Sequence, residues 1–173
     1  LQAAAVVGRQ FAVIILSRLL EEPDQAVVGR LGQLQTLDFV FLVEQLVYSF
    51  KHALTQEVVY SGLLERRRRR IHAAAGAVLE EIHAGRTDEV VELLAYHFGR
   101  SGETEKAVDY AILAAEKAQR RWAHTEALAH FDSALKLLAT APDTGPNRLR
   151  RIDAVIKQAE IKFALGRHAE HIQ

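Results

Sequence analysis

The sequence contains neither cysteine nor methionine, and each absence narrows what the chain can do. Without cysteine, disulfides, thiolate metal sites and cysteine nucleophiles are all excluded. Absence of cysteine is also weakly typical of a reducing compartment, so we expect a cytoplasmic location. The chain has no initiator methionine and starts with Leu1 inside an apolar helical pattern, so we expect it to be a piece of a larger protein.

A charge excess and a long hydrophobic run are missing as well. Lys and Arg together number 22, Asp and Glu also number 22, and the balance holds on both sides of Gly85. A nucleic-acid-binding domain usually carries a basic excess, so this balance argues against nucleic acid as a partner and favours a protein-facing surface. The longest apolar runs, such as residues 11–16, are far below the roughly 20 residues of a membrane span, so no membrane association is expected.

Apolar spacing predicts helices at the start of the chain. A 3.6-residue period indicates helix over residues 1–22, divided in two at Gly8. A further helical pattern follows over 24–37, with Asp24 as a candidate N-cap. In a DNA-binding winged helix this helix would read the DNA, but Arg30 is its only basic residue, which argues against contacts to bases and phosphates.

Residues 39–50 change the period and introduce β-structure. Side chains there alternate with a period of two, which predicts two strands joined at 44–45 as a hairpin. Helical spacing resumes at His52. The order of helices, hairpin and further helices predicts a winged-helix domain with a trailing helical stalk over residues 1–85.

The rest of the chain, residues 86–173, shows only helical patterns separated by short breaks. Helices are predicted over 88–100, 103–121, 125–138 and 147–165. Gly166 is expected to open the next turn. The A-x3-F-x2-A signature of a tetratricopeptide second helix occurs at Ala127, Phe131 and Ala134. We therefore predict a mainly α chain that ends in an array of tetratricopeptide-like helical hairpins. In this array the helix predicted over 103–121 belongs to two hairpins.

Several stretches of the sequence resemble a known family. Residues 50–60 read F-K-H-A-L-T-Q-E-V-V-Y, residues 69–72 read R-R-I-H, and the chain opens with L-Q-A-A-A-V-V-G-R-Q-F. These stretches resemble the segment that follows the ATPase core in bacterial multidomain signalling proteins. In those proteins a class III adenylate/guanylate cyclase or a helix-turn-helix output domain is joined to a STAND-type ATPase and a tetratricopeptide array. The resemblance covers nearly the whole chain.

The resemblance implies a non-catalytic regulatory and protein-interaction segment. The parent would bind ATP or ADP and be linked to an adenylate or guanylate cyclase. Expected partners are an upstream ATPase domain in the same chain and a protein or peptide ligand on the helical repeats. Two alternatives stay open: the middle segment of a transcriptional regulator with a DNA-binding output domain, and a plain repeat scaffold that does not switch.

The residues themselves offer nothing for catalysis. No phosphate-binding glycine loop and no nucleophile motif occur, so the segment is expected to bind no cofactor and not to be an enzyme. The histidine pairs His124 with His130 and His168 with His171 have no carboxylate pair at ligand spacing, so no metal site is expected.

His52 is the residue that the resemblance singles out. In STAND ATPases a winged-helix histidine contacts the β-phosphate of bound ADP and holds the resting state, and Lys51-His52-Ala53-Leu54 resembles that position. This sequence departs from the family at Ala53, where an acidic residue often stands. An imidazole can donate a hydrogen bond to a phosphate oxygen. The alternative is a histidine that caps the helix after the hairpin.

Five consecutive arginines form the other candidate interaction site. They are Arg66, Arg67, Arg68, Arg69 and Arg70. Five successive residues cover every side of a helix, so they cannot form a single stripe. One interpretation is a contact to phosphate, nucleic acid or an acidic domain surface. The alternative is a solvated helix whose aliphatic stems cover apolar surface and whose charge is partly balanced by Glu65, Glu80 and Glu81.

Overall fold

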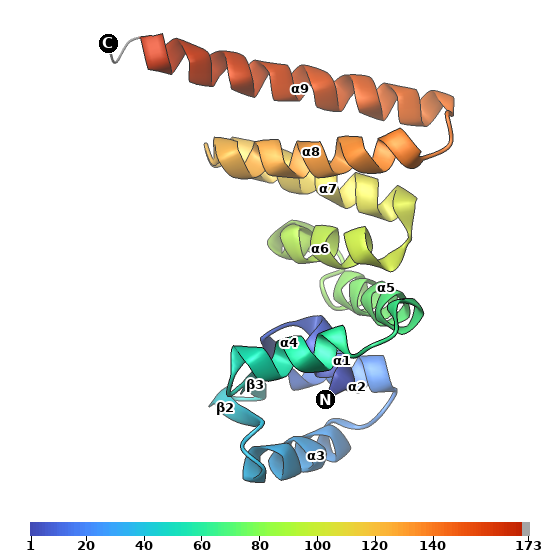
Figure 1. The fold of residues 1–173 in the computed structure, drawn as a ribbon, viewed down its shortest axis with the longest axis vertical. Coiled ribbons are helices and arrows are strands. Elements are labelled where there is room, and N and C mark those ends of the chain that lie inside the picture. The colour runs from blue at the N-terminus through green and yellow to red at the C-terminus, as the bar shows by residue number, and fades with distance from the viewer. Residues whose placement is uncertain (171–173) are drawn as a thin grey trace. The chain divides into compact units, whose positions relative to one another are not determined.

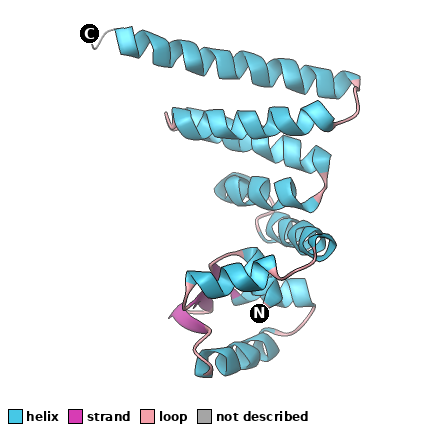
Figure 2. Ribbon diagram, viewed as in Figure 1, coloured by secondary structure: helices cyan, strands magenta, loops and turns pink. Residues whose placement is uncertain are grey.

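The computed structural model describes the backbone of residues 1–170 and the side chains of residues 1–166. The described chain is mainly helical, as predicted, with a small three-stranded antiparallel sheet (Figures 1 and 2). It divides into two compact units, one spanning Leu1–Ala84 and one that begins at Gly85.

The first unit contains all the strands among the described residues. Its elements are α1 (Gln2–Val7), β1 (Gln10–Ala12), α2 (Val13–Leu20), α3 (Asp24–Thr36), β2 (Val40–Glu44), β3 (Val47–Phe50), α4 (Ala53–Ser61) and α5 (Glu65–Ile82). The second unit is helical throughout its described part. Its elements are the short 3-10 helix η1 (Thr87–Val90), α6 (Val91–Ser101), α7 (Thr104–Arg120), α8 (His124–Thr140) and α9 (Gly145–Glu170).

The sheet of the first unit brings the start of the chain beside the predicted hairpin. The strand order is β1–β3–β2, and both pairs are antiparallel. Phe11 of β1 stands opposite Tyr48, and its ring meets Phe50 edge-on with 5.5 Å between centroids. Because β3 is the central strand, Tyr48 and Phe50 are buried, whereas the edge strand β2 buries only Val40.

One hydrophobic core holds the first unit together. Val27 and Leu31 lie one turn apart on α3 and face the sheet and α2, which explains the 3.6-residue period of this segment. The buried members of this core are Ala4, Ala5, Phe11, Val13, Leu16, Val27, Leu31, Val40, Tyr48 and Phe50.

Strand β1 corrects the prediction of helix over residues 1–22. A short apolar run suits a buried strand as well as a helix, so periodicity alone could not distinguish the two. Gly8 adopts φ 149°, which turns the chain out of α1, and the amide of Phe50 donates to the carbonyl of Arg9 at 3.0 Å. The partner that makes this segment a strand lies about 40 positions away, so the local sequence carries little sign of it.

Two predicted boundaries are also wrong. Pro23, not Asp24, occupies the N-cap of α3, and Asp24 is the first helical residue, where its charge suits the positive end of the helix. Helix α9 does not turn at Gly166 but continues to Glu170. A single glycine lowers helix propensity by only about 1 kcal/mol, which packing along a long helix can offset.

Helix α7 packs against both α6 and α8, which are its neighbours along the chain (Figure 1). Its contact faces are lined with small side chains that let the helices approach closely. These buried alanines are Ala107, Ala111, Ala114, Ala115 and Ala118. On α8 the signature residues Ala127, Phe131 and Ala134 are all completely buried. Gly102, at φ 91°, ends α6 in the left-handed conformation and opens the turn into α7.

Candidate functional site

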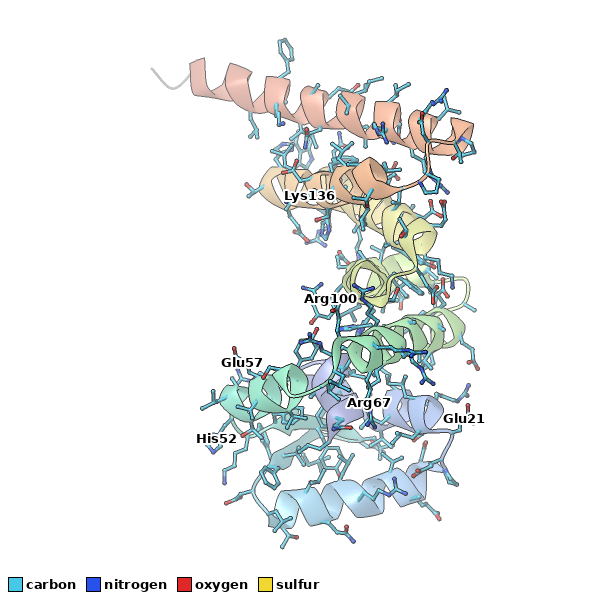
Figure 3. The ribbon with its side chains drawn as sticks, turned by 45° about the vertical axis from the view of Figure 1, so that its right-hand side comes forward. Glu21, His52, Glu57, Arg67, Arg100 and Lys136 are labelled. Carbon is cyan, nitrogen blue, oxygen red and sulfur yellow. The ribbon has the colours of Figure 1, made fainter. Side chains whose placement is uncertain are left out.

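His52 lies at the corner between β3 and α4, where it is the N-cap residue of α4 (Figure 3). Its backbone carbonyl accepts a hydrogen bond from the amide of Thr55 at 3.1 Å. Its exposed side chain makes no capping hydrogen bond to the described residues. The backbone therefore takes part in starting the helix, while the imidazole can donate to an acceptor outside the unit.

The residue before His52 is anchored to the start of the hairpin. The Lys51 ammonium lies 2.6 Å from Oδ1 of Asp38, and the Lys51 amide donates to the carbonyl of Phe39 at 3.0 Å. The hydrogen bond and the charge of Lys51 lower the pKa of the Asp38 carboxyl. Both side chains are exposed, so the pair adds little stability, but it restricts the backbone that carries His52.

Exposed apolar side chains flank this corner. Phe41, Leu42 and Val43 of the edge strand β2 are 43%, 49% and 45% exposed. On α4, Leu54 and Val58 lie one turn apart and are 67% and 60% exposed. Apolar side chains beside an unpaired strand edge favour association with another surface, so this corner is a candidate docking face.

The arginine run separates into residues with different surroundings. Arg69 pairs with Glu65 one turn earlier at 2.5 Å, and the Arg68 guanidinium lies over the ring of Tyr60 at 5.2 Å from its centroid. Of the carboxylates expected to balance the run, Glu81 pairs instead with a residue of α2. The run thus covers several sides of α5, as five successive helical positions must.

The other three arginines line an open groove of about 1100 Å³ in the first unit. Residues of α1, α2, α3 and the first half of α5 form its walls. Arg66, Arg67 and Arg70 come from α5, and Arg30, which comes from α3, pairs with Glu22 at 2.9 Å. Among the described residues, no ion pair or hydrogen bond engages the side chains of Arg66, Arg67 or Arg70. The groove therefore combines an apolar interior with uncompensated positive charge.

Ion pairs in the second unit join the start of α6 to the end of α7. The Lys117 ammonium lies 2.8 Å from Oε2 of Glu92 and donates to the carbonyl of Asp88 at 2.6 Å. Arg120 pairs with the Asp88 carboxylate at 2.9 Å, and Arg121 reaches Glu92 at 3.4 Å. These contacts fix the ends of the first helix pair against one another.

Tyr96 and Trp122 are aromatic side chains on the surface of the second unit. The Arg100 guanidinium sits 4.0 Å from the centroid of the Tyr96 ring, and both side chains reach solvent. Trp122, in the turn between α7 and α8, is 78% exposed and meets the His124 ring edge-on at 5.7 Å. Exposed Trp, Tyr and Arg are the residue types enriched at energetically important protein contacts.

Within the described residues, no three His, Asp or Glu side chains gather closely enough to hold a metal ion. The side chain of His168 and the whole of His171 lie outside the described part of the chain. No helix in the described part is both long enough and apolar enough to cross a membrane.

The chain is similar to an uncharacterized protein of Rhizobium meliloti (strain 1021), with 27% identity over 140 residues. The match covers 79% of this chain, and the chain spans only 14% of the length of that curated relative. Since 140 residues make up 14% of it, the relative is about 1,000 residues long. No family model and no solved structure matches the chain.

Sequence reasoning named the arginine run but missed the groove. A signal was present, because Arg66 and Arg70 lie one turn apart, and Arg67, Ile71 and Ala74 follow the same face of α5. Leucines of α2 and α3 complete the groove, and they come from helices more than 30 positions earlier. Only the tertiary packing of α5 against α1 and α2 brings these faces together.

Proposed function

We propose that the chain is a regulatory and protein-interaction segment of a larger ATP-binding signalling protein, without catalytic activity of its own. Residues 1–85 form a winged-helix domain with a trailing helical stalk, and residues 86–173 form tetratricopeptide-like repeats. A STAND-type ATPase domain that binds ATP or ADP precedes the segment, and the output is an adenylate or guanylate cyclase.

The topology of the first unit supports the winged-helix assignment. The elements follow the order helix, strand, helix, helix, strand, strand, and the last two strands form a hairpin whose second strand pairs with β1. This is the order of a winged-helix domain, with the β2–β3 hairpin as the wing. In the α3 helix, the only arginine already pairs with a glutamate of the same unit, which argues against a DNA-reading role.

The packing of the second unit supports the repeat assignment. A tetratricopeptide unit is a pair of antiparallel helices with small residues where the helices cross. Helices α7 and α8 pack on each other through buried alanines and through Phe131, and α7 and α8 in turn contact α6 and α9. Each inner helix therefore packs on two neighbours, as in a solenoid.

The observation that carries the proposed mechanism is the uncommitted imidazole of His52 within an exposed apolar corner. An ATPase domain docked on this corner would cover apolar side chains such as Phe41 and Leu54, and would bring the imidazole to a bound nucleotide. His52 then donates a hydrogen bond to the β-phosphate of ADP. A protein or peptide ligand on the repeats shifts the balance between this docked state and an open state.

The length of the Rhizobium protein is in line with a segment of a multidomain chain, because the match occupies only 14% of it. The experiment on the mechanism uses the full-length parent. His52→Ala removes one hydrogen bond to a charged group, worth about 1.5–3 kcal/mol, so ADP release should accelerate roughly tenfold to hundredfold. His52→Gln keeps an N–H donor that can replace part of the hydrogen bond, so it should accelerate ADP release less than His52→Ala does.

The melting temperature of the isolated 173-residue chain provides the control, because His52 is exposed and contributes nothing to the core. It should be unchanged by either substitution. An ADP release rate that is the same in the parent and in the His52→Ala variant would refute the switch role.

A further inference from the structure

The groove on the first unit contains apolar surface that the chain leaves uncovered. Its interior is lined by Leu16 and Leu31, which belong to the hydrophobic core. At its margins, Leu20 is 40% exposed and Leu64 is 80% exposed. Covering leucine side chains in such positions with another apolar surface lowers the free energy.

Positive charge lies along one wall of the same groove. Arg66, Arg67 and Arg70 come from the first two turns of α5, are exposed, and have no ion pair within the described structure. Guanidinium groups bind carboxylates in a bidentate geometry, which gives direction as well as attraction. The wall therefore matches a partner that presents carboxylates beside an apolar stripe.

We propose that this groove receives an acidic amphipathic helix of a protein partner. Leucine-like side chains spaced at i, i+3, i+4 and i+7 on that helix contact the apolar interior, as in other helix-in-groove complexes. Glutamate or aspartate side chains along its flank pair with Arg66, Arg67 and Arg70. The inference goes beyond the proposed function, because the groove is built from other elements than the His52 corner and does not depend on a nucleotide.

The form and charge of the groove favour a helix over other occupants. Small-molecule sites bury about 70–90% of the surface of their ligand, whereas this groove of about 1100 Å³ is open to solvent and would leave one side of its occupant exposed. Residues 1–84 carry nine basic and nine acidic side chains, so the positive charge is local and does not form the broad basic surface of a nucleic-acid-binding domain. A local cationic wall beside apolar side chains selects for both features of an acidic amphipathic helix.

Fluorescence anisotropy with three labelled helical peptides of about 16 residues, or four turns, tests the proposal on the 173-residue chain. One peptide carries a leucine stripe flanked by glutamates, the second is its scrambled sequence, and the third has lysine in place of glutamate. Only the first should bind saturably. Arg67→Glu and Arg70→Glu should each weaken its binding about tenfold or more, and the affinity should fall as salt rises.

Two matched controls separate the groove from general charge and general hydrophobicity. Arg69→Glu makes the same charge change on the same helix outside the groove, and Leu37→Ser is the control for Leu64→Ser at an exposed leucine of the same unit that lines neither the groove nor the His52 corner. Arg69→Glu and Leu37→Ser should leave binding unchanged, while Leu64→Ser should weaken it severalfold without changing the circular dichroism spectrum.

Three outcomes would each overturn the proposal. The first is an equal affinity for the acidic peptide and its scrambled version, or an equal loss in Arg69→Glu and Arg67→Glu. The second is no binding of any of the three peptides. The third is binding to vesicles of phosphatidylserine and phosphatidylcholine that depends on Leu64, without binding of the acidic peptide, which would make the groove a lipid site.

Discussion

The hydroxyl of Tyr60 lies 3.0 Å from Nε2 of His72, and this contact joins α4 to a histidine that is completely buried in α5. The two rings meet edge-on with 5.9 Å between their centroids. The Tyr60 ring also contacts the guanidinium of Arg68, which lies over its face. A single tyrosine thus helps to hold in place the helix that carries the arginine wall of the groove.

Tyr60→Phe keeps the ring but removes the hydroxyl that bonds to His72. Loss of a hydrogen bond to a buried polar atom costs about 1–3 kcal/mol, so the free energy of unfolding should fall by that amount. Tyr48→Phe is the matched control, because Tyr48 is buried in the core against which the partly buried Tyr60 packs, but no hydrogen bond to its hydroxyl is found among the described residues. Urea denaturation followed by circular dichroism compares them, and equal losses would contradict the role given to the Tyr60–His72 bond.

The sequence was sufficient to predict elements whose stabilising pattern is local. The face of α3 that carries Val27 and Leu31 repeats with the helical period, and the alternation in β2 and β3 gave the hairpin. His52 was also expected at the start of the helix after the hairpin, and it is the N-cap residue there. In each case the residues that decide the structure lie within one or two turns of one another.

Features that depend on distant residues were beyond local patterns. Phe11 is in a strand because it pairs with Tyr48, and the groove exists because α5 packs against α1 and α2. Arg66 lines the groove whereas Arg69 pairs with Glu65, because the rest of the unit covers one side of α5 and not the other. The sequence predicted that the run could not form one stripe, but not which members would share a surface.

The Lys117–Glu92 ion pair provides a second prediction. Burial raises the pKa of the Glu92 carboxyl, but hydrogen bonds from Lys117 and from the backbone, with the charges of Lys117 and Arg121, outweigh it and lower the pKa overall. A carboxyl with a lowered pKa stabilises the fold above its ordinary value of 4.5 and loses this contribution as the pH falls below it.

Lys117→Met keeps most of the aliphatic stem but removes the charge. Because both side chains of the pair are partly buried, the free energy of unfolding at pH 7 should fall by about 1 kcal/mol. The difference from the unmodified chain should shrink as the pH falls below 4.5. Lys136→Met, at an exposed position on α8 (Figure 3), should change stability by less than about 0.5 kcal/mol. A difference that is constant with pH would contradict the contribution of Glu92.

His97 predicts a separate pH dependence. This residue of α6 is buried, and burial together with the charge of Arg100 lowers the pKa of His97 from 6.5 to about 4. Between these values the unfolded chain binds a proton that the folded chain does not, so the free energy of unfolding falls as the pH falls from 6.5 to 4. The full shift corresponds to about 3 kcal/mol.

His97→Gln does not titrate in this range and should reduce the slope of stability against pH. Urea denaturation at several pH values between 6.5 and 5.5 measures this effect, because the contribution of Glu92, whose ordinary pKa is 4.5, changes mainly below that window. The substitution will also change stability at pH 7, so the slope and not the absolute value is the measurement that matters. An unchanged slope would show that His97 binds its proton equally in the folded and unfolded chains.

Trp122 combines a strained backbone with an exposed side chain. Its φ of 60° lies in the left-handed region, which a bulky side chain rarely adopts and which costs roughly 1–2 kcal/mol outside glycine. Because the side chain is 78% exposed, it recovers little of this cost by burial. An exposed tryptophan held in an unfavourable conformation is typical of a residue that contributes to binding and not to folding.

Trp122→Gly should therefore raise the free energy of unfolding of the second unit by about 0.5–1 kcal/mol, since glycine adopts this conformation without strain but gains entropy in the unfolded chain. Trp122→Ala, which retains the strain and loses the ring, should be no more stable than the unmodified chain. Circular dichroism must follow unfolding, because Trp122 is the only tryptophan. A glycine variant that is less stable than the alanine variant would contradict the assignment of backbone strain to Trp122. If the glycine variant is more stable, Trp122 lowers the stability of the unit. Both variants should then bind the protein or peptide ligand of the repeats less well in the full-length parent.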